Sequence, residues 1–135
     1  MSDVELHSID EPLYEAEGRV ISMKDLLLYF DKVGSMRVSD LHLKVGTPPT
    51  YRIDGTLQPI RGGAPLNKKT MRALVSTVLN ELELQSLEDD RSVDSSYITD
   101  AMQFRMNLFH DNDGLCAAIR ALNSKVPPIE KIGFP

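Results

Sequence analysis

The sequence predicts an α+β fold in which helices pack on one face of an antiparallel sheet. Helical spacing of apolar residues alternates with strand-like alternation, in the order helix, three strands, helix, three strands. The pair Asp54-Gly55 tolerates the positive φ angles of a two-residue turn, which joins antiparallel neighbours. A chain of 135 residues is long enough for one such domain with a sizeable core.

The first ordered element is predicted to be a helix from Ser22 to about Gly34. Ser22 can cap the first turn together with Asp25, and Gly34 suits the left-handed position that ends many helices. The apolar residues at helical spacing are Met23, Leu26, Leu27, Phe30 and Val33.

Three short strands are predicted next. In 39–45, "SDLHLKV", apolar and polar residues alternate as in a half-buried strand. In 50–60, "TYRIDGTLQPI", two strands are joined at Asp54-Gly55, and Pro59 confines the second of them to a sheet edge or a bulge.

The helical pattern returns from Asn67 to about Glu83, with Asn67 as the cap, and a second helical piece is expected near 84–90. The apolar stripe consists of Met71, Leu74, Val75, Val78, Leu79 and Leu82. Three further strands are predicted at 93–98, 103–109 and 115–122.

Charge and proline content divide the chain into three parts. Residues 1–20 carry six acidic residues against Arg19 alone, so we expect an acidic, disordered tail. Residues 21–122 are expected to form the folded domain. Residues 123–135 contain Pro127-Pro128, which favours an extended linker to a further domain.

Composition excludes several classes of function. No apolar run is long enough to span a membrane, and the N-terminus is unlike a signal peptide. The only cysteine, Cys116, rules out a disulfide framework and indicates a reducing cytoplasm. Basic residues form no stripe and tryptophan is absent, which argues against nucleic-acid binding.

Two stretches resemble ligand-binding loops only in part. In 62–70, "GGAPLNKKT", a phosphate-binding loop would need glycine in place of Asn67 and serine or threonine in place of Lys69, so we predict a turn and a capped helix. In 110–114, "HDNDG", alternate acids lack the distal glutamate of a calcium loop, which favours a hairpin turn.

No metal site or catalytic nucleophile is predicted. The histidines, His7, His42 and His110, are not spaced as ligands on one helix face. No serine has the flanking residues of a nucleophile elbow, and Cys116 is expected to be a small buried hydrophobe.

The hairpin formed by 103–109 and 115–122 carries two arginines on its polar face. If its apolar faces coincide and Phe109 pairs with Cys116, Arg105 lies directly opposite Arg120; a register shifted by two residues makes them diagonal neighbours. Like charges in these positions destabilise a sheet.

Two interpretations of the arginine pair remain open at this point. Both side chains can extend into solvent or pair with acids such as Asp94 or Asp100. Alternatively Arg105 and Arg120 converge on an anion such as a phosphate, which accepts paired hydrogen bonds from two guanidinium groups.

Two motifs carry a resemblance to a known family. Ser39 to Ile60 and Phe104 to Pro135 closely resemble the N-terminal domain of the type II/type IV secretion ATPase superfamily. The form "LHLKVGTPP…RIDG" is most similar to the branch that retracts type IV pili, the PilT-type twitching-motility ATPases. The match departs from the usual family pattern at Gln103, Asp113 and Val38. These departures leave the two arginine positions unchanged.

The resemblance implies a PAS-like domain that precedes a RecA-like motor domain in a hexameric ring. In that family the domain packs on the neighbouring subunit's motor domain, and the arginines at the positions of Arg105 and Arg120 approach its ATP phosphates. ATP and Mg²⁺ would bind the full-length ATPase. This fragment has no Walker A loop, so it is expected to bind neither and to be inactive alone.

The same resemblance implies a cytoplasmic motor, peripheral to the inner membrane through the platform proteins of the pilus machinery. Two alternatives are the N-terminal domain of a pilus-assembly or type II secretion ATPase and a stand-alone PAS-like sensor. The sensor would require a preformed pocket lined by polar groups beneath the helices.

Overall fold

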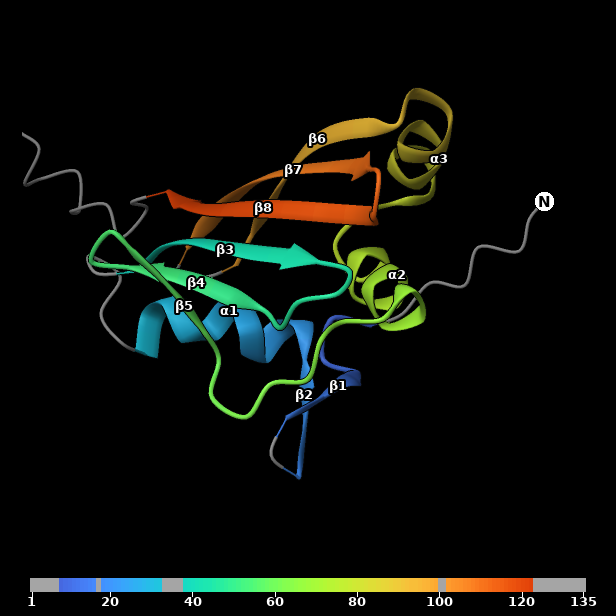
Figure 1. Ribbon diagram of the computed structural model, residues 1–135. Helices are drawn as coiled ribbons and strands as arrows, with labels where there is room; N and C mark the ends of the chain where they lie inside the picture. The colour runs from blue at the N-terminus through green and yellow to red at the C-terminus, as the bar shows by residue number, and fades with distance from the viewer. Residues whose placement is uncertain (1–7, 17, 33–37, 100–101, 123–135) are drawn as a thin grey trace, which may run out of the picture.

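A six-stranded antiparallel sheet forms the centre of the molecule (Figure 1). The computed structural model describes residues 8–16, 18–32, 38–99 and 102–122. The strand order is β5-β4-β3-β8-β7-β6, and every neighbouring pair is antiparallel. The strands are β3 (Val38–Lys44), β4 (Thr50–Ile53), β5 (Thr56–Pro59), β6 (Ser92–Ile98), β7 (Gln103–Asp111) and β8 (Gly114–Leu122).

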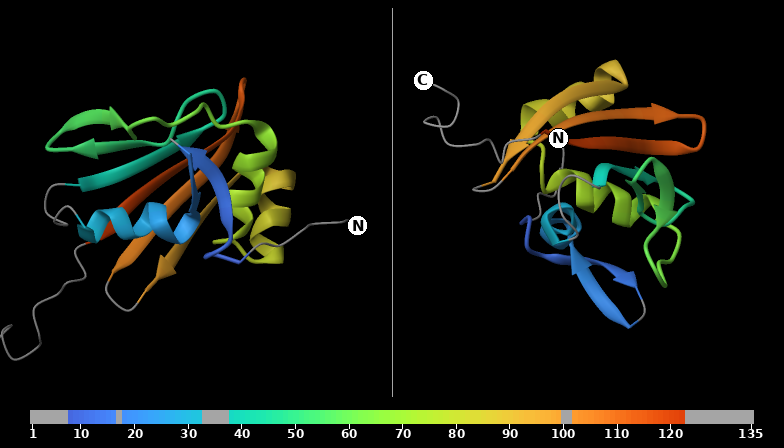
Figure 2. Two further views of the ribbon diagram at one scale, coloured as in Figure 1. Left: turned by 90° about the horizontal axis from the view of Figure 1, so that it is seen from below. Right: turned by 90° about the vertical axis from the view of Figure 1, so that its left-hand side faces the viewer.

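Within the described residues three helices pack on this sheet: α1 (Met23–Lys32), α2 (Lys68–Ser76) and α3 (Glu81–Asp90). α1 and α2 lie beneath one face, and α3 packs at the edge beside β6 (Figures 1 and 2). No helix of the described residues covers the opposite face, which is called the open face below. The α+β class predicted from the sequence is therefore confirmed. No helix in the described ranges has the length and apolar content needed to cross a lipid bilayer.

The core between sheet and helices is centred on three aromatic rings. Phe30 of α1 meets Tyr51 of β4 and Phe104 of β7 edge to face, with ring centroids 5.7 and 5.3 Å apart. All three side chains are almost fully buried. Burial raises the pKa of Tyr51, and its hydroxyl donates a hydrogen bond to the carbonyl of Leu26. The inner face is thus filled by side chains.

The local signals at the first helix and first hairpin are confirmed. The amide of Ser22 donates to Asp25 Oδ2, and the amide of Asp25 donates to Ser22 Oγ, each at 3.0 Å. Asp54 and Gly55 have φ angles of 51° and 82°, as the predicted turn requires. Pro59 lies on β5, an edge strand. The predicted helix end, Gly34, lies outside the described residues.

The N-terminal region differs from the expected acidic tail. From residue 8 the chain is described, and β1 (Pro12–Ala16) and β2 (Arg19–Ser22) form an antiparallel hairpin. Tyr14 and Ala16 are buried, and the Tyr14 hydroxyl donates to the carbonyl of Ala64 at 2.5 Å. Glu15, the acidic residue within β1, is exposed between these two buried residues, so the acidic composition of this region is compatible with a strand. Residues 1–7 and 123–135 lie outside the described ranges.

The predicted helix from Asn67 to about Glu83 is two helices. Asn67 caps α2 as expected, accepting a hydrogen bond from the Thr70 amide at 2.7 Å, but α2 ends at Ser76. Asn80 then starts α3 through a reciprocal capping box with Glu83. Leu82 was expected in the apolar stripe and is instead 80% exposed. The local cap at Asn80 outweighs the continuous helical spacing.

His110 of β7 is a partly buried group that makes the stability of the domain depend on pH. Its Nε2 atom has no hydrogen-bond partner among the described residues, and Glu88 Oε2 lies 3.7 Å away. Burial, followed by the charge of Arg91, lowers the pKa of His110 below its ordinary value of 6.5, with Glu88 opposing and Arg72 reinforcing this shift. The neutral imidazole is therefore the folded form.

We expect the folded domain to lose stability as the pH falls below about 6.5, because the unfolded chain then binds a proton that the folded chain resists. Urea unfolding between pH 7.5 and 5 should show a steeper loss for the wild type than for His110→Gln. The variant carries the other titrating groups and serves as the control. Parallel pH profiles for the two proteins would contradict this assignment.

Candidate functional site

The register of the β7–β8 hairpin places two arginines side by side on the open face of the sheet. Phe109 pairs with Cys116, and Arg105 pairs directly with Arg120. This is the first of the two registers considered from the sequence. Inward-facing residues of both strands, such as Phe104, Met106 and Ile119, are buried, which holds the register and keeps both arginines on the outer face.

Strand order extends this pair into a row of polar and charged residues across the sheet. On β3, Asp40 pairs with Arg120, and on β4, Arg52 pairs with Asp40. On the other side, Ser96 of β6 pairs with Arg105. The row therefore runs Arg52, Asp40, Arg120, Arg105 and Ser96, with alternating charge on one side and adjacent like charges in its centre.

Asp40 is the counter-ion of Arg120. Arg120 Nε donates to Asp40 Oδ1 at 3.1 Å, while Arg52 Nε lies 3.6 Å from Asp40 Oδ2. The carboxylate is 12% exposed, whereas the Arg120 side chain is 69% exposed. The expected partner Asp94 instead accepts a hydrogen bond from Asn107 Nδ2 at 2.7 Å, and Asp100 lies outside the described residues.

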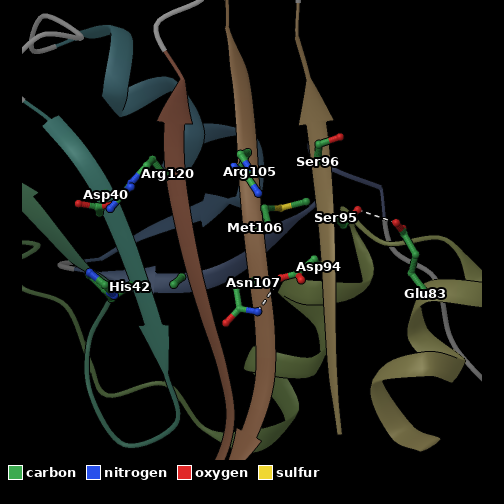
Figure 3. A pocket seen from close by; sticks show the side chains of 11 residues that line it. Asp40, His42, Glu83, Asp94, Ser95, Ser96, Arg105, Met106, Asn107 and Arg120 are labelled. Atoms are coloured by element: carbon green, nitrogen blue, oxygen red, sulfur yellow. Dashed lines mark hydrogen bonds and ion pairs between the residues drawn. The ribbon is translucent and has the colours of Figure 1, made fainter. Parts of the chain in front are cut away.

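Arg105 has a different environment from Arg120. It is exposed on the open face, and no described residue forms a hydrogen bond or ion pair with its guanidinium. Figure 3 shows it between Arg120 and Ser96, above a shallow depression that is also lined by His42, Asp94 and Asn107. Its guanidinium donors are therefore available to bind an anion.

The stretch that resembles a phosphate loop is a structural turn. A Cβ atom on Gly63 would lie 2.7 Å from the Tyr14 hydroxyl and 2.8 Å from the side chain of Ile60, so this backbone is packed against the β1 strand. Asn67 then caps α2. Both features match the turn and capped helix predicted from the sequence.

The turn at 110–114 is stabilised by its own side chains. Asp111 Oδ1 accepts the amides of Asp113 and Gly114 at 2.8 and 3.0 Å, and Asp111 Oδ2 lies 3.4 Å from Lys44 Nζ. Within the described ranges no group of three acidic, histidine or cysteine residues is placed to hold a metal ion. His7 lies outside those ranges.

Cys116 is buried, as expected for a small hydrophobe. Its Sγ atom lies 3.3 Å from Asp111 Oδ2. Burial, together with this carboxylate, raises the pKa of the Cys116 thiol to about 11. The thiolate needed for nucleophilic attack is therefore scarce at neutral pH.

Comparison with known proteins finds relatives that carry this domain in a longer chain, although no family model matches. The type IV pilus retraction ATPase PilT of Pseudomonas aeruginosa is 33% identical over 115 residues, which is 84% of this chain. The type IV pilus ATPase PilU of the same organism is 24% identical over 113 residues, or 83% of the chain. The chain spans 32% and 28% of their lengths.

The fold is also found in a solved structure. The crystal structure of the pilus retraction motor PilT with bound ADP superimposes with a TM-score of 0.65 and 30% sequence identity. The match covers 82% of this chain and 32% of that one. The sequence comparison and the fold comparison thus both find a PilT protein.

Proposed function

Since the chain is an N-terminal domain of the PilT type of pilus retraction ATPase, we propose that it supplies Arg105 and Arg120 to the phosphates of ATP bound by a neighbouring motor domain. The observation that carries this proposal is the direct pairing of the two arginines on the open face of the sheet, which none of the described helices covers. One of the two guanidinium groups has no partner in the described structure.

The chemistry of phosphoryl transfer accounts for such a pair. Negative charge spreads over the γ-phosphate oxygens in the transition state, and planar guanidinium groups match these oxygens with paired N–H···O bonds. In the absence of nucleotide Arg105 and Arg120 repel one another. When a triphosphate is bound, both guanidinium groups are attracted to the same anion, which offsets their mutual repulsion. The pair then stabilises the negative charge of the phosphate.

The same proposal places the nucleotide site in a separate motor domain and the domain itself in a ring of subunits. The solved PilT structure contains ADP. The described residues of this chain include no phosphate loop, so ATP and Mg²⁺ would be held by a RecA-like motor domain, and this fragment would be inactive alone. The domain would pack on the neighbour's motor domain in a homohexamer, with 123–135 as the linker that permits movement between nucleotide states.

We further propose that the assembled motor works in the cytoplasm, at the inner membrane, on the platform proteins of the pilus machinery. Twitching motility would be the cellular result. The two curated relatives are both named as type IV pilus ATPases, which supports this setting.

A mixing experiment tests whether the arginines act between subunits. One full-length protein would carry Arg105→Ala with Arg120→Ala, and a second would lack the Walker A lysine of its motor domain. Each alone should hydrolyse little ATP. Mixed rings should regain turnover, because an intact motor domain then meets an intact arginine pair on its neighbour.

The mixing ratio provides the control. Turnover should pass through a maximum when both proteins are present in similar amounts, and each protein mixed with itself should show no gain. If no ratio restores turnover although gel filtration shows mixed rings, the arginines do not act in trans.

A further inference from the structure

Arg120 is held in one orientation by a single carboxylate. Its Nε donates to Asp40 Oδ1 at 3.1 Å, while most of the side chain is exposed to solvent. Figure 3 shows the Arg120 side chain extending toward Asp40, on the side away from Arg105. This contact lowers the repulsion between the two arginines, because it draws one of the positive charges toward a negative one.

Asp40 keeps other partners if Arg120 leaves. Ser39 Oγ donates to Asp40 Oδ2 at 2.8 Å, and Arg52 Nε lies 3.6 Å from the same oxygen. Arg52 is itself anchored, because its Nη1 atom donates a hydrogen bond to the carbonyl of Gly55 at 3.0 Å. A largely buried carboxylate that loses its only counter-ion destabilises a protein strongly. Here a second cation remains, so the loss of Arg120 is tolerated.

Arg120 is thus the mobile member and Asp40 the fixed member of the pair. The carboxylate is 12% exposed and bonded within β3, whereas Arg120 is 69% exposed and bonded once. A phosphate near Arg105 offers Arg120 more negative charge and more acceptor oxygens than one carboxylate oxygen does. The Asp40 carboxylate and the phosphate therefore compete for the guanidinium group of Arg120.

We propose that Asp40 competes with phosphate for Arg120: it holds Arg120 away from Arg105 in the absence of ligand, and phosphate binding transfers Arg120 from the carboxylate to the anion. This rests on the proposed function, because it assumes that the arginine pair binds phosphate. Asp40 is then a positioning residue that sets how much phosphate is needed to bring the two arginines together.

The test is a titration of the 135-residue chain with inorganic pyrophosphate, followed through the NMR signals of the arginine Nε–H groups. In the wild type the Arg120 signal should move from its carboxylate-bonded position as pyrophosphate is added. Asp40→Asn should bind pyrophosphate about threefold to fivefold more tightly, which is the range of a partly exposed ion pair. Arg105→Ala should weaken binding in both backgrounds.

Asp94→Asn provides the matched control for loss of a negative charge. Asp94 lines the same depression, lies diagonal to Arg105 on the sheet and contacts Asn107 rather than an arginine. Asn at position 94 can still accept that hydrogen bond. At 150 mM salt Asp94→Asn should change the affinity less than about twofold, since screening reduces effects that involve no direct contact.

The outcomes separate the two proposals. If Asp40→Asn binds no more tightly than Asp94→Asn, or more weakly than the wild type, the competition is wrong while phosphate binding stands. If pyrophosphate leaves both arginine signals unchanged in every protein, or binding survives Arg105→Ala unaltered, the arginine pair does not bind phosphate on this domain and the premise of the competition is wrong. The mixing experiment decides separately whether the pair acts on ATP held by a neighbouring motor domain. The wild-type Arg120 signal needs no variant, so a folding defect in Asp40→Asn does not prevent a decision.

Discussion

Arg105→Ala in the full-length ATPase is expected to lower ATP turnover by about 100-fold or more. Removing one charge-stabilising donor from an acyl-transfer site costs about 100- to 1000-fold, and an arginine at a phosphoryl-transfer site is worth about 1000-fold or more. The reason is that Arg105 presents a complete guanidinium with no described partner beside the proposed phosphate position. Steady-state phosphate release, measured with ATP at saturation, gives the comparison directly.

The domain should remain folded in this variant, because Arg105 is exposed and contributes no described ion pair. Arg72→Ala is the matched control: Arg72 is an exposed arginine on α2, and its Nη2 atom donates to Glu88 Oε2 at 3.1 Å, away from the open face. It should leave turnover within about twofold of the wild type, in keeping with the small value of surface ion pairs.

Arg105→Lys distinguishes charge from geometry. Lysine retains the positive charge but lacks the planar pair of donors, so we expect turnover between that of the wild type and that of Arg105→Ala. Turnover that is the same in the wild type, Arg105→Ala and Arg120→Ala would remove both residues from the nucleotide site.

Phe30→Ala is expected to destabilise the domain by about 3–5 kcal/mol, the usual loss when a buried phenylalanine is truncated in a core. Phe30 is fully buried where α1 crosses the inner face, and its ring touches both Tyr51 and Phe104. The cavity left behind would lie between two strands and a helix, where neighbouring side chains cannot easily fill it. Urea or guanidinium unfolding measures the change.

Leu28→Ala is the control on the same helix. Leu28 is 46% exposed, so its truncation should cost well below about 1 kcal/mol. Phe30→Leu keeps most of the apolar volume and should fall between the two. Equal losses for Phe30→Ala and Leu28→Ala would show that α1 does not depend on the aromatic core for its attachment.

Local chemistry made several features of the fold predictable. Ser22 with Asp25, Asn67, and Asp54-Gly55 each act within a few residues, so their roles as caps and turn follow from residue type and spacing. The sequence alone did not show which of two competing local signals is stronger. Helical spacing of apolar residues through 67–83 predicts one continuous helix, whereas in the structure the capping box at Asn80 starts a second helix.

The sequence by itself determined that Arg105 and Arg120 share one face of a hairpin, because side chains alternate along strands and the apolar residues of both strands must face the same core. Only the tertiary structure decided that Asp40 lies beside Arg120. That contact requires β3 to be the neighbour of β8, although their paired residues are far apart along the chain. Strand order depends on how helices and strands pack together around one core, and no spacing within a strand encodes it.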